Sequence, residues 1–77
     1  MLVKDRLRHQ ASDSLARAVR GAYRSVHHAA DELGINERKL RAACDGELEK
    51  LTVKDLRTLG PLMTEPERDA LREWCVP

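Results

Sequence analysis

The sequence predicts an all-α domain, a compact bundle of about five short helices, and three observations support this. Phenylalanine is absent, with one Tyr and one Trp, so Leu, Val, Ile and Ala must fill the interior, as suits close-packed helices. Apolar residues recur at intervals of three and four, the period of a helix. Capping residues and glycines mark the ends of several short segments. A chain of 77 residues buries only about 60 per cent of its unfolded surface, so the core is small.

The first helix is predicted from Ser14 onward, where one face carries Leu15, Ala18, Val19, Ala22 and Tyr23. The preceding segment, residues 1–10, is charged and poorly periodic. Two alternatives therefore stay open for residues 1–12, a flexible arm or an early extension of the first helix. No linker rich in Pro, Gly or Ser divides the chain, so residues 1–77 are expected to form a single domain.

Two short helices are predicted to meet at a tight turn. Ser25 can cap a helix that ends at Gly34, because glycine tolerates a left-handed backbone. Its apolar stripe is Val26, Ala29, Ala30 and Leu33. Asn36 offers the next N-cap, for a helix that stops at Asp45-Gly46 and buries Leu40, Ala43 and Cys44.

Two capping boxes predict the last two helices. Thr52 with Asp55 opens a helix that Gly60-Pro61 is expected to close. Thr64 with Glu67 opens another, with Pro66 in its first turn, where a missing N–H costs little. The expected apolar face of this last helix is Ala70, Leu71, Trp74 and Cys75.

Residues 26–45 resemble the helix-turn-helix of phage repressors and Cro-like proteins, which have a lambda-repressor-like fold. The motif core would be Ala30, small where the helices cross, Gly34 at the turn, and Ile35 with Leu40 in the angle between them. The resemblance implies that helix 37–44 enters the DNA major groove. The alternative is an ordinary helical hairpin in which the same residues only pack.

Residues 34–41 and 50–56 are similar to the phage regulatory protein CII family, and the similarity covers roughly residues 14–60. It implies a phage or prophage regulator of the choice between lytic and lysogenic growth, which binds DNA as an oligomer. The charged amino-terminal segment departs from this pattern. We therefore expect a sequence-specific, double-stranded DNA-binding transcriptional regulator.

With Leu40 and Ala43 turned inward, the outward side of the third helix would carry the DNA contacts. Arginine can bind guanine O6 and N7, a carboxylate can accept from cytosine, and alanine can touch a thymine methyl. The predicted base-reading residues are Glu37, Arg38, Arg41 and Ala42. The predicted phosphate-binding residues, near the helix starts, are Ser25, His27, Asn36 and Lys39.

Charge and apolar surface suggest the partners. Residues 1–46 hold nine Lys/Arg against six Asp/Glu, a balance of +3, whereas residues 47–77 hold five against seven, a balance of −2. A polyanion therefore suits the amino-terminal part. A homodimer is expected, with Leu71 and Trp74 as candidate contacts, and host transcription machinery is a further candidate partner. The alternative from another class is a helical protein-interaction module, an antirepressor or inhibitor that uses the apolar carboxyl-terminal helix.

Catalytic, metal and membrane roles are not expected. His27 and His28 are adjacent, so on a helix they point about 100 degrees apart and cannot chelate together. Cys44 and Cys75 lie far apart without ligand spacing, so no disulfide framework or zinc site is predicted and both should be reduced, partly buried residues. No cofactor is indicated. The chain has neither a signal-peptide pattern nor a run of about 20 apolar residues, so a cytoplasmic location, in a bacterial cell or nucleoid, is expected.

Overall fold

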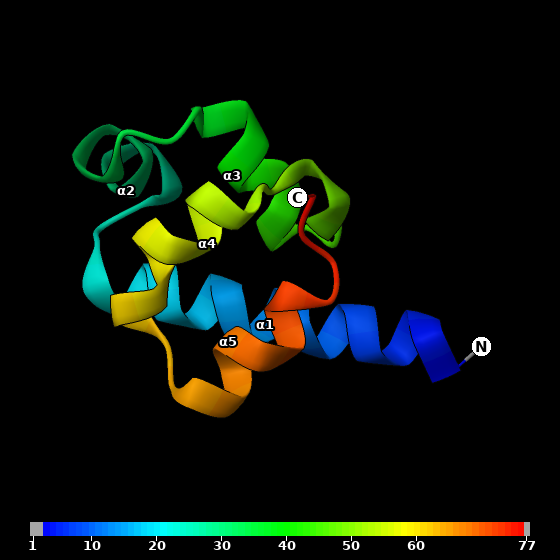
Figure 1. Ribbon diagram of the computed structural model, residues 1–77. Coiled ribbons are helices and arrows are strands. Elements are labelled where there is room, and N and C mark those ends of the chain that lie inside the picture. The colour runs from blue at the N-terminus through cyan, green and yellow to red at the C-terminus, as the bar shows by residue number, and fades with distance from the viewer. Residues whose placement is uncertain (1–2, 77) are drawn as a thin grey trace.

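The computed structural model describes residues 3–76, and within them it contains five α-helices and no strand of a sheet. Figure 1 labels the helices α1 (Val3–Ala22), α2 (Val26–Leu33), α3 (Glu37–Cys44), α4 (Val53–Leu59) and α5 (Glu65–Arg72). Two 3-10 turns, Leu48–Lys50 and Gly60–Leu62, precede and follow α4. The predicted all-α class with five helices is confirmed.

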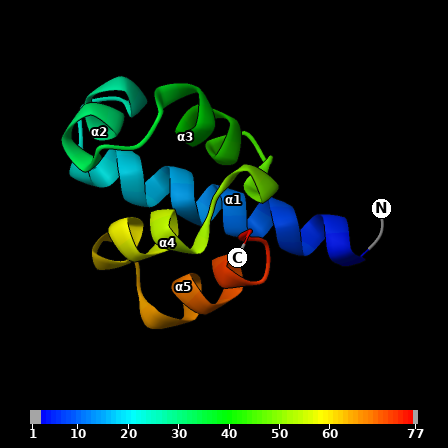
Figure 2. The ribbon, with the colours of Figure 1, turned by 45° about the horizontal axis from the view of Figure 1, so that its top comes forward.

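The long helix α1 is the support on which the others pack. In the views of Figures 1 and 2, α3 lies on one side of α1 and α5 on the other. Leu15 and Val19 of α1 have no exposed surface, because helices cover this helix from both sides. The helix begins at Val3, so residues 3–12 form its first turns and are not a flexible arm; residues 1 and 2 of that predicted arm lie outside the described part.

The core is aliphatic, as the absence of phenylalanine predicts. Every helix contributes to it, and so does the segment between α3 and α4. The buried cluster is Ala11, Leu15, Val19, Ala29, Ala30, Ile35, Leu40, Ala43, Leu48, Leu51, Leu56, Leu59, Met63 and Leu71. The two aromatic residues, Tyr23 and Trp74, are half-buried and pack at its edge.

Burial corrects the predicted dimer contact and the predicted face of the last helix. Leu71 has no exposed surface, so it has nothing to offer a second protomer, whereas Ala70 next to it is exposed. The helix ends at Arg72, so Trp74 and Cys75 lie in the turn beyond it and not on its apolar face. That turn is fixed by the chain end, because the Val76 N–H donates to the Leu51 carbonyl at 2.7 Å.

α4 ends at Leu59 with Gly60 as its C-cap, as predicted, but the conformation of the glycine is not the one expected at a helix end. Gly60 has a right-handed backbone, φ −51°, and begins the 3-10 turn Gly60–Leu62. The chain becomes extended only at Met63. Arg68 from α5 lies against Gly60, where an added Cβ would come within 3.1 Å of the arginine Cδ. A side chain there would have to displace the Arg68 side chain slightly, and the glycine is not required by a left-handed turn.

Candidate nucleic-acid interface

Helices α2 and α3 are joined by a turn of three residues, and local hydrogen bonds fix both helix ends. The Ser25 hydroxyl accepts from the His28 N–H at 3.1 Å, and the Asn36 side chain accepts from the Lys39 N–H at 3.2 Å, so both predicted N-caps are confirmed. Between them Gly34 is left-handed, with φ 71°, as predicted for the helix end. This turn sets the angle at which α3 leaves α2.

The predicted motif core packs inside this angle. Leu40 is fully buried, and Ala30 and Ile35 are nearly so. The Ala30 carbonyl accepts from the N–H groups of both Gly34 and Ile35, which satisfies a carbonyl at the end of α2. The four residues therefore hold two helices at a fixed angle, an arrangement that a helical hairpin and a DNA-binding motif share.

One side of α3 faces the core and the other faces the surface. Leu40 and Ala43 are fully buried. Arg38 and Arg41 are exposed, and Glu37 and Ala42 are partly exposed. The structure thus brings the four predicted base-reading residues to one surface of α3. Arg38 has no ion-pair partner within residues 3–76.

Three of the predicted DNA contacts also contact one another. Glu37 Oε2 lies 2.7 Å from Arg41 Nη2, and Glu37 Oε1 contacts His27 Nδ1 of α2. Hydrogen bonding to Glu37 raises the pKa of His27. Hydrogen bonds from His27 and Arg41 lower the pKa of Glu37. This His27–Glu37–Arg41 cluster therefore joins α2 to α3 and offsets part of the positive charge on the exposed side of α3.

Lys39 is engaged elsewhere, contrary to its predicted role as a phosphate contact. Its Nζ lies 2.5 Å from Asp55 Oδ2, and both side chains are mostly covered. Asp55 also closes the capping box of α4, because its carboxylate accepts from the Thr52 N–H at 2.9 Å. Burial acts to raise the pKa of Asp55, but the hydrogen bonds from Lys39 and Thr52 outweigh it and the pKa is lowered. Lys39 thus fastens α3 to α4.

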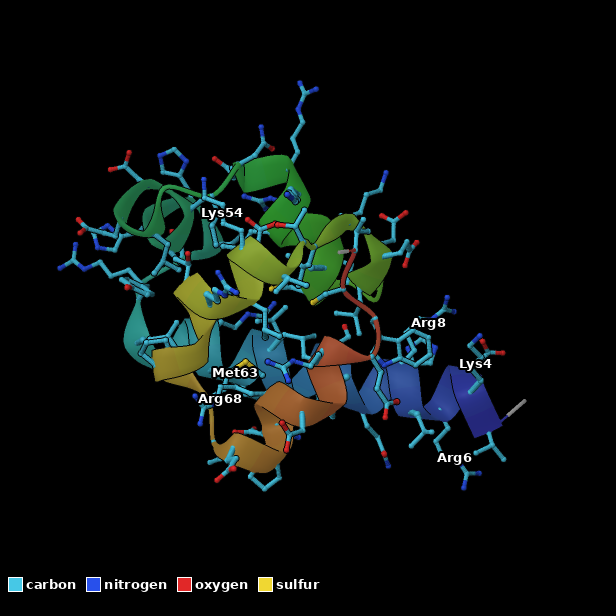
Figure 3. The ribbon with its side chains drawn as sticks, viewed as in Figure 1. Lys4, Arg6, Arg8, Lys54, Met63 and Arg68 are labelled. Atoms are coloured by element: carbon cyan, nitrogen blue, oxygen red, sulfur yellow. The ribbon has the colours of Figure 1, made fainter. Side chains whose placement is uncertain are left out.

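The remaining predicted phosphate contacts keep atoms available to a ligand. Ser25 and Asn36 are exposed, and capping uses only one acceptor of each. Lys54, a cation with no predicted role, is exposed at the start of α4 and in Figure 3 points toward the side of α2 and α3. The sequence places Lys54 two residues after the predicted cap at Thr52, in the first turn of that helix.

The structure brings together no metal site in the part of the chain it describes. No three His, Cys, Asp or Glu side chains there converge as metal ligands would. Cys44 and Cys75 are free and half-buried, and burial raises the pKa of both thiols. Of the helices between residues 3 and 76, none combines the length and apolar character needed to cross a membrane.

Comparisons with protein-family models, curated proteins and solved structures found no match for this chain.

Proposed function

We propose that the protein is a sequence-specific double-stranded DNA-binding transcriptional regulator, in which α2 and α3 act as a helix-turn-helix and α3 enters the major groove. The observation that carries the proposal is the two-sided character of α3. Leu40 and Ala43 fix one side in the core, while the opposite side presents two exposed arginines. A phage or prophage origin is supported only by the resemblance of the sequence to such regulators.

In this proposal Arg38 is the principal base-reading residue. It is exposed on α3, and no carboxylate among the described residues pairs with it, so it can meet a guanine without first losing a partner. Arg41 can contact a base only if its ion pair with Glu37 is broken. Ser25, Asn36 and Lys54 contact phosphates, which position the protein without reading sequence.

The test is a fluorescence-anisotropy titration of the protein against random duplexes at low and moderate salt, followed by sequencing of the bound fraction. Salt-sensitive binding with an enriched sequence is expected, because phosphate contacts release counterions. On the enriched duplex, Arg38→Ala should weaken binding by about 5- to 150-fold, equivalent to about 1–3 kcal/mol, and relax the preference at one base pair.

Arg17→Ala is the matched control. Arg17 is exposed on α1, outside the two helices proposed to contact DNA, and pairs with Asp13, so its loss should leave both affinity and base preference unchanged. Equal effects of the two arginine substitutions would contradict the assignment to α3. Binding that never depends on salt would contradict the proposed function as a whole.

The second candidate, a protein-interaction module, is favoured by one observation. Val3 and Leu7 are apolar residues on the surface of α1, beside Trp74. The predicted use of the carboxyl-terminal helix itself is weakened, because Leu71 is buried. Such a module would bind a protein with little dependence on salt and would enrich no DNA sequence.

A further inference from the structure

Three arginines from two helices line one hollow in the surface. Arg57 comes from α4, and Arg68 and Arg72 come from α5. We name the hollow that these three residues line the α4–α5 hollow. Its volume is about 440 Å³, which lies within the range of about 300–1,000 Å³ that is usual for small-molecule sites. Within residues 3–76, no carboxylate forms an ion pair with any of the three arginines.

Gly60 holds one of these arginines at the hollow. The glycine is buried and also lines the hollow, and a Cβ built on it would lie 3.1 Å from Arg68 Cδ and 3.8 Å from Arg68 Nη1. The Arg68 side chain therefore lies against the glycine along its length, and its guanidinium stays at the hollow instead of extending into solvent. A group that is already held in place loses less conformational freedom when it binds a ligand.

Two carboxylates also line the hollow and leave it with a positive balance. Glu65 and Asp69 lie three residues before Arg68 and Arg72, a spacing at which ion pairs can form on a helix. Neither pair forms among the described residues. The hollow thus carries three positive charges against two negative charges, a balance of +1. The unpaired guanidinium groups remain available to an anion.

We propose that the α4–α5 hollow binds a small phosphate-bearing molecule, whose phosphate oxygens accept hydrogen bonds from Arg57, Arg68 and Arg72. The planar guanidinium group matches the geometry of a phosphate and can bind two of its oxygens at once. No residue of α2 or α3 lines the hollow, and α5 lies on the side of α1 opposite α3 (Figures 1 and 2). The inference therefore goes beyond the proposed DNA binding and does not rest on it.

The first experiment is an NMR titration of the full chain with inorganic phosphate, at constant pH and at an ionic strength held constant with sodium chloride. The amide signals of Gly60 and Arg68 should shift and saturate, while those of α3 stay in place. Arg68→Gln should weaken the binding several-fold, because it removes a charged donor. Arg17→Gln is the matched control, since Arg17 lies on α1 and does not line the hollow. Circular dichroism of each variant checks that it is folded.

A second variant should change the affinity in the opposite direction. Asp69→Asn should tighten phosphate binding several-fold, because it removes a negative charge from the hollow, whereas Asp13→Asn on α1 should leave it unchanged.

Three outcomes would overturn the proposal. Sodium chloride alone could produce the same shifts, which would show charge screening instead of binding. Arg17→Gln could weaken the binding as much as Arg68→Gln. The signals of the hollow could respond to a short DNA duplex but not to inorganic phosphate or glucose 6-phosphate, which would make the ligand the DNA backbone and not a small molecule.

Discussion

The replacement of Gly34 by alanine isolates the contribution of the turn between α2 and α3. Gly34 has φ 71° and ψ 27°, and a Cβ added there would meet no atom within 4 Å. The whole cost is therefore the left-handed backbone, about 1–2 kcal/mol for a residue with a Cβ. Gly21 provides the matched control, because an added Cβ there also meets no atom but the residue is helical. Gly21→Ala should stabilise the protein by about 0.5–1 kcal/mol.

The same added methyl group thus has opposite effects at two positions, and thermal unfolding measures both. For a domain of this size 1 kcal/mol shifts the Tm by about 4–8 °C. Gly34→Ala should lower the Tm by about 4–16 °C, and Gly21→Ala should raise it by about 2–8 °C. Gly34→Asn should lose less than Gly34→Ala, because asparagine tolerates the left-handed region. Equal stability of Gly34→Ala and the wild type would refute the reasoning, since it would mean that the turn does not need a left-handed residue.

Three further predictions concern side chains. A double-mutant cycle of Lys39→Met and Asp55→Asn should give a coupling of about 1 kcal/mol, because both groups are mostly covered; additive losses would contradict the link between α3 and α4. The raised pKa of His27 means that its contact with Glu37 stabilises the fold fully below the unfolded value near 6.5 and is lost as pH rises through the folded value. NMR titration should therefore show a higher His27 pKa in the wild type than in Glu37→Gln, and identical values would refute the contact. The Cys44 thiol, whose pKa burial raises, should react with a disulfide reagent at neutral pH more slowly than a free cysteine; equal rates would show that it is accessible.

Helix starts could be predicted from the sequence because both partners of each cap lie within a few residues. Ser25 and Asn36 each accept from an N–H three residues further on. The Thr52 hydroxyl likewise accepts from the Asp55 N–H, and in both capping boxes the carboxylate three residues on accepts from the N–H of the cap, Thr52 or Thr64. Such contacts depend on local backbone geometry, so their prediction needs no knowledge of the fold.

Contacts between elements could not be predicted in this way. The hydrogen bond from Val76 to Leu51 fixes the turn after α5, yet the two residues are far apart in sequence. The sequence predicts the end of α4 at Gly60, but it does not show that this glycine lies against the Arg68 side chain of another helix. Leu71 was predicted to be a dimer contact, but it is fully buried. The periodicity of a helix identifies its apolar side and does not show whether the rest of the fold covers that side.

The charge of the candidate interface could not be predicted from the sequence either, because it depends on contacts between side chains. The sequence of α3 offers three cations, Arg38, Lys39 and Arg41, and a count of them predicts a strongly basic surface. In the folded chain Lys39 is paired with Asp55, and Arg41 with Glu37. Only Arg38 is left without a carboxylate partner within the described residues. If α3 binds DNA, Arg38 is therefore the arginine free to contact a base, and Arg41 adds to the selectivity only where a base replaces Glu37 as its partner.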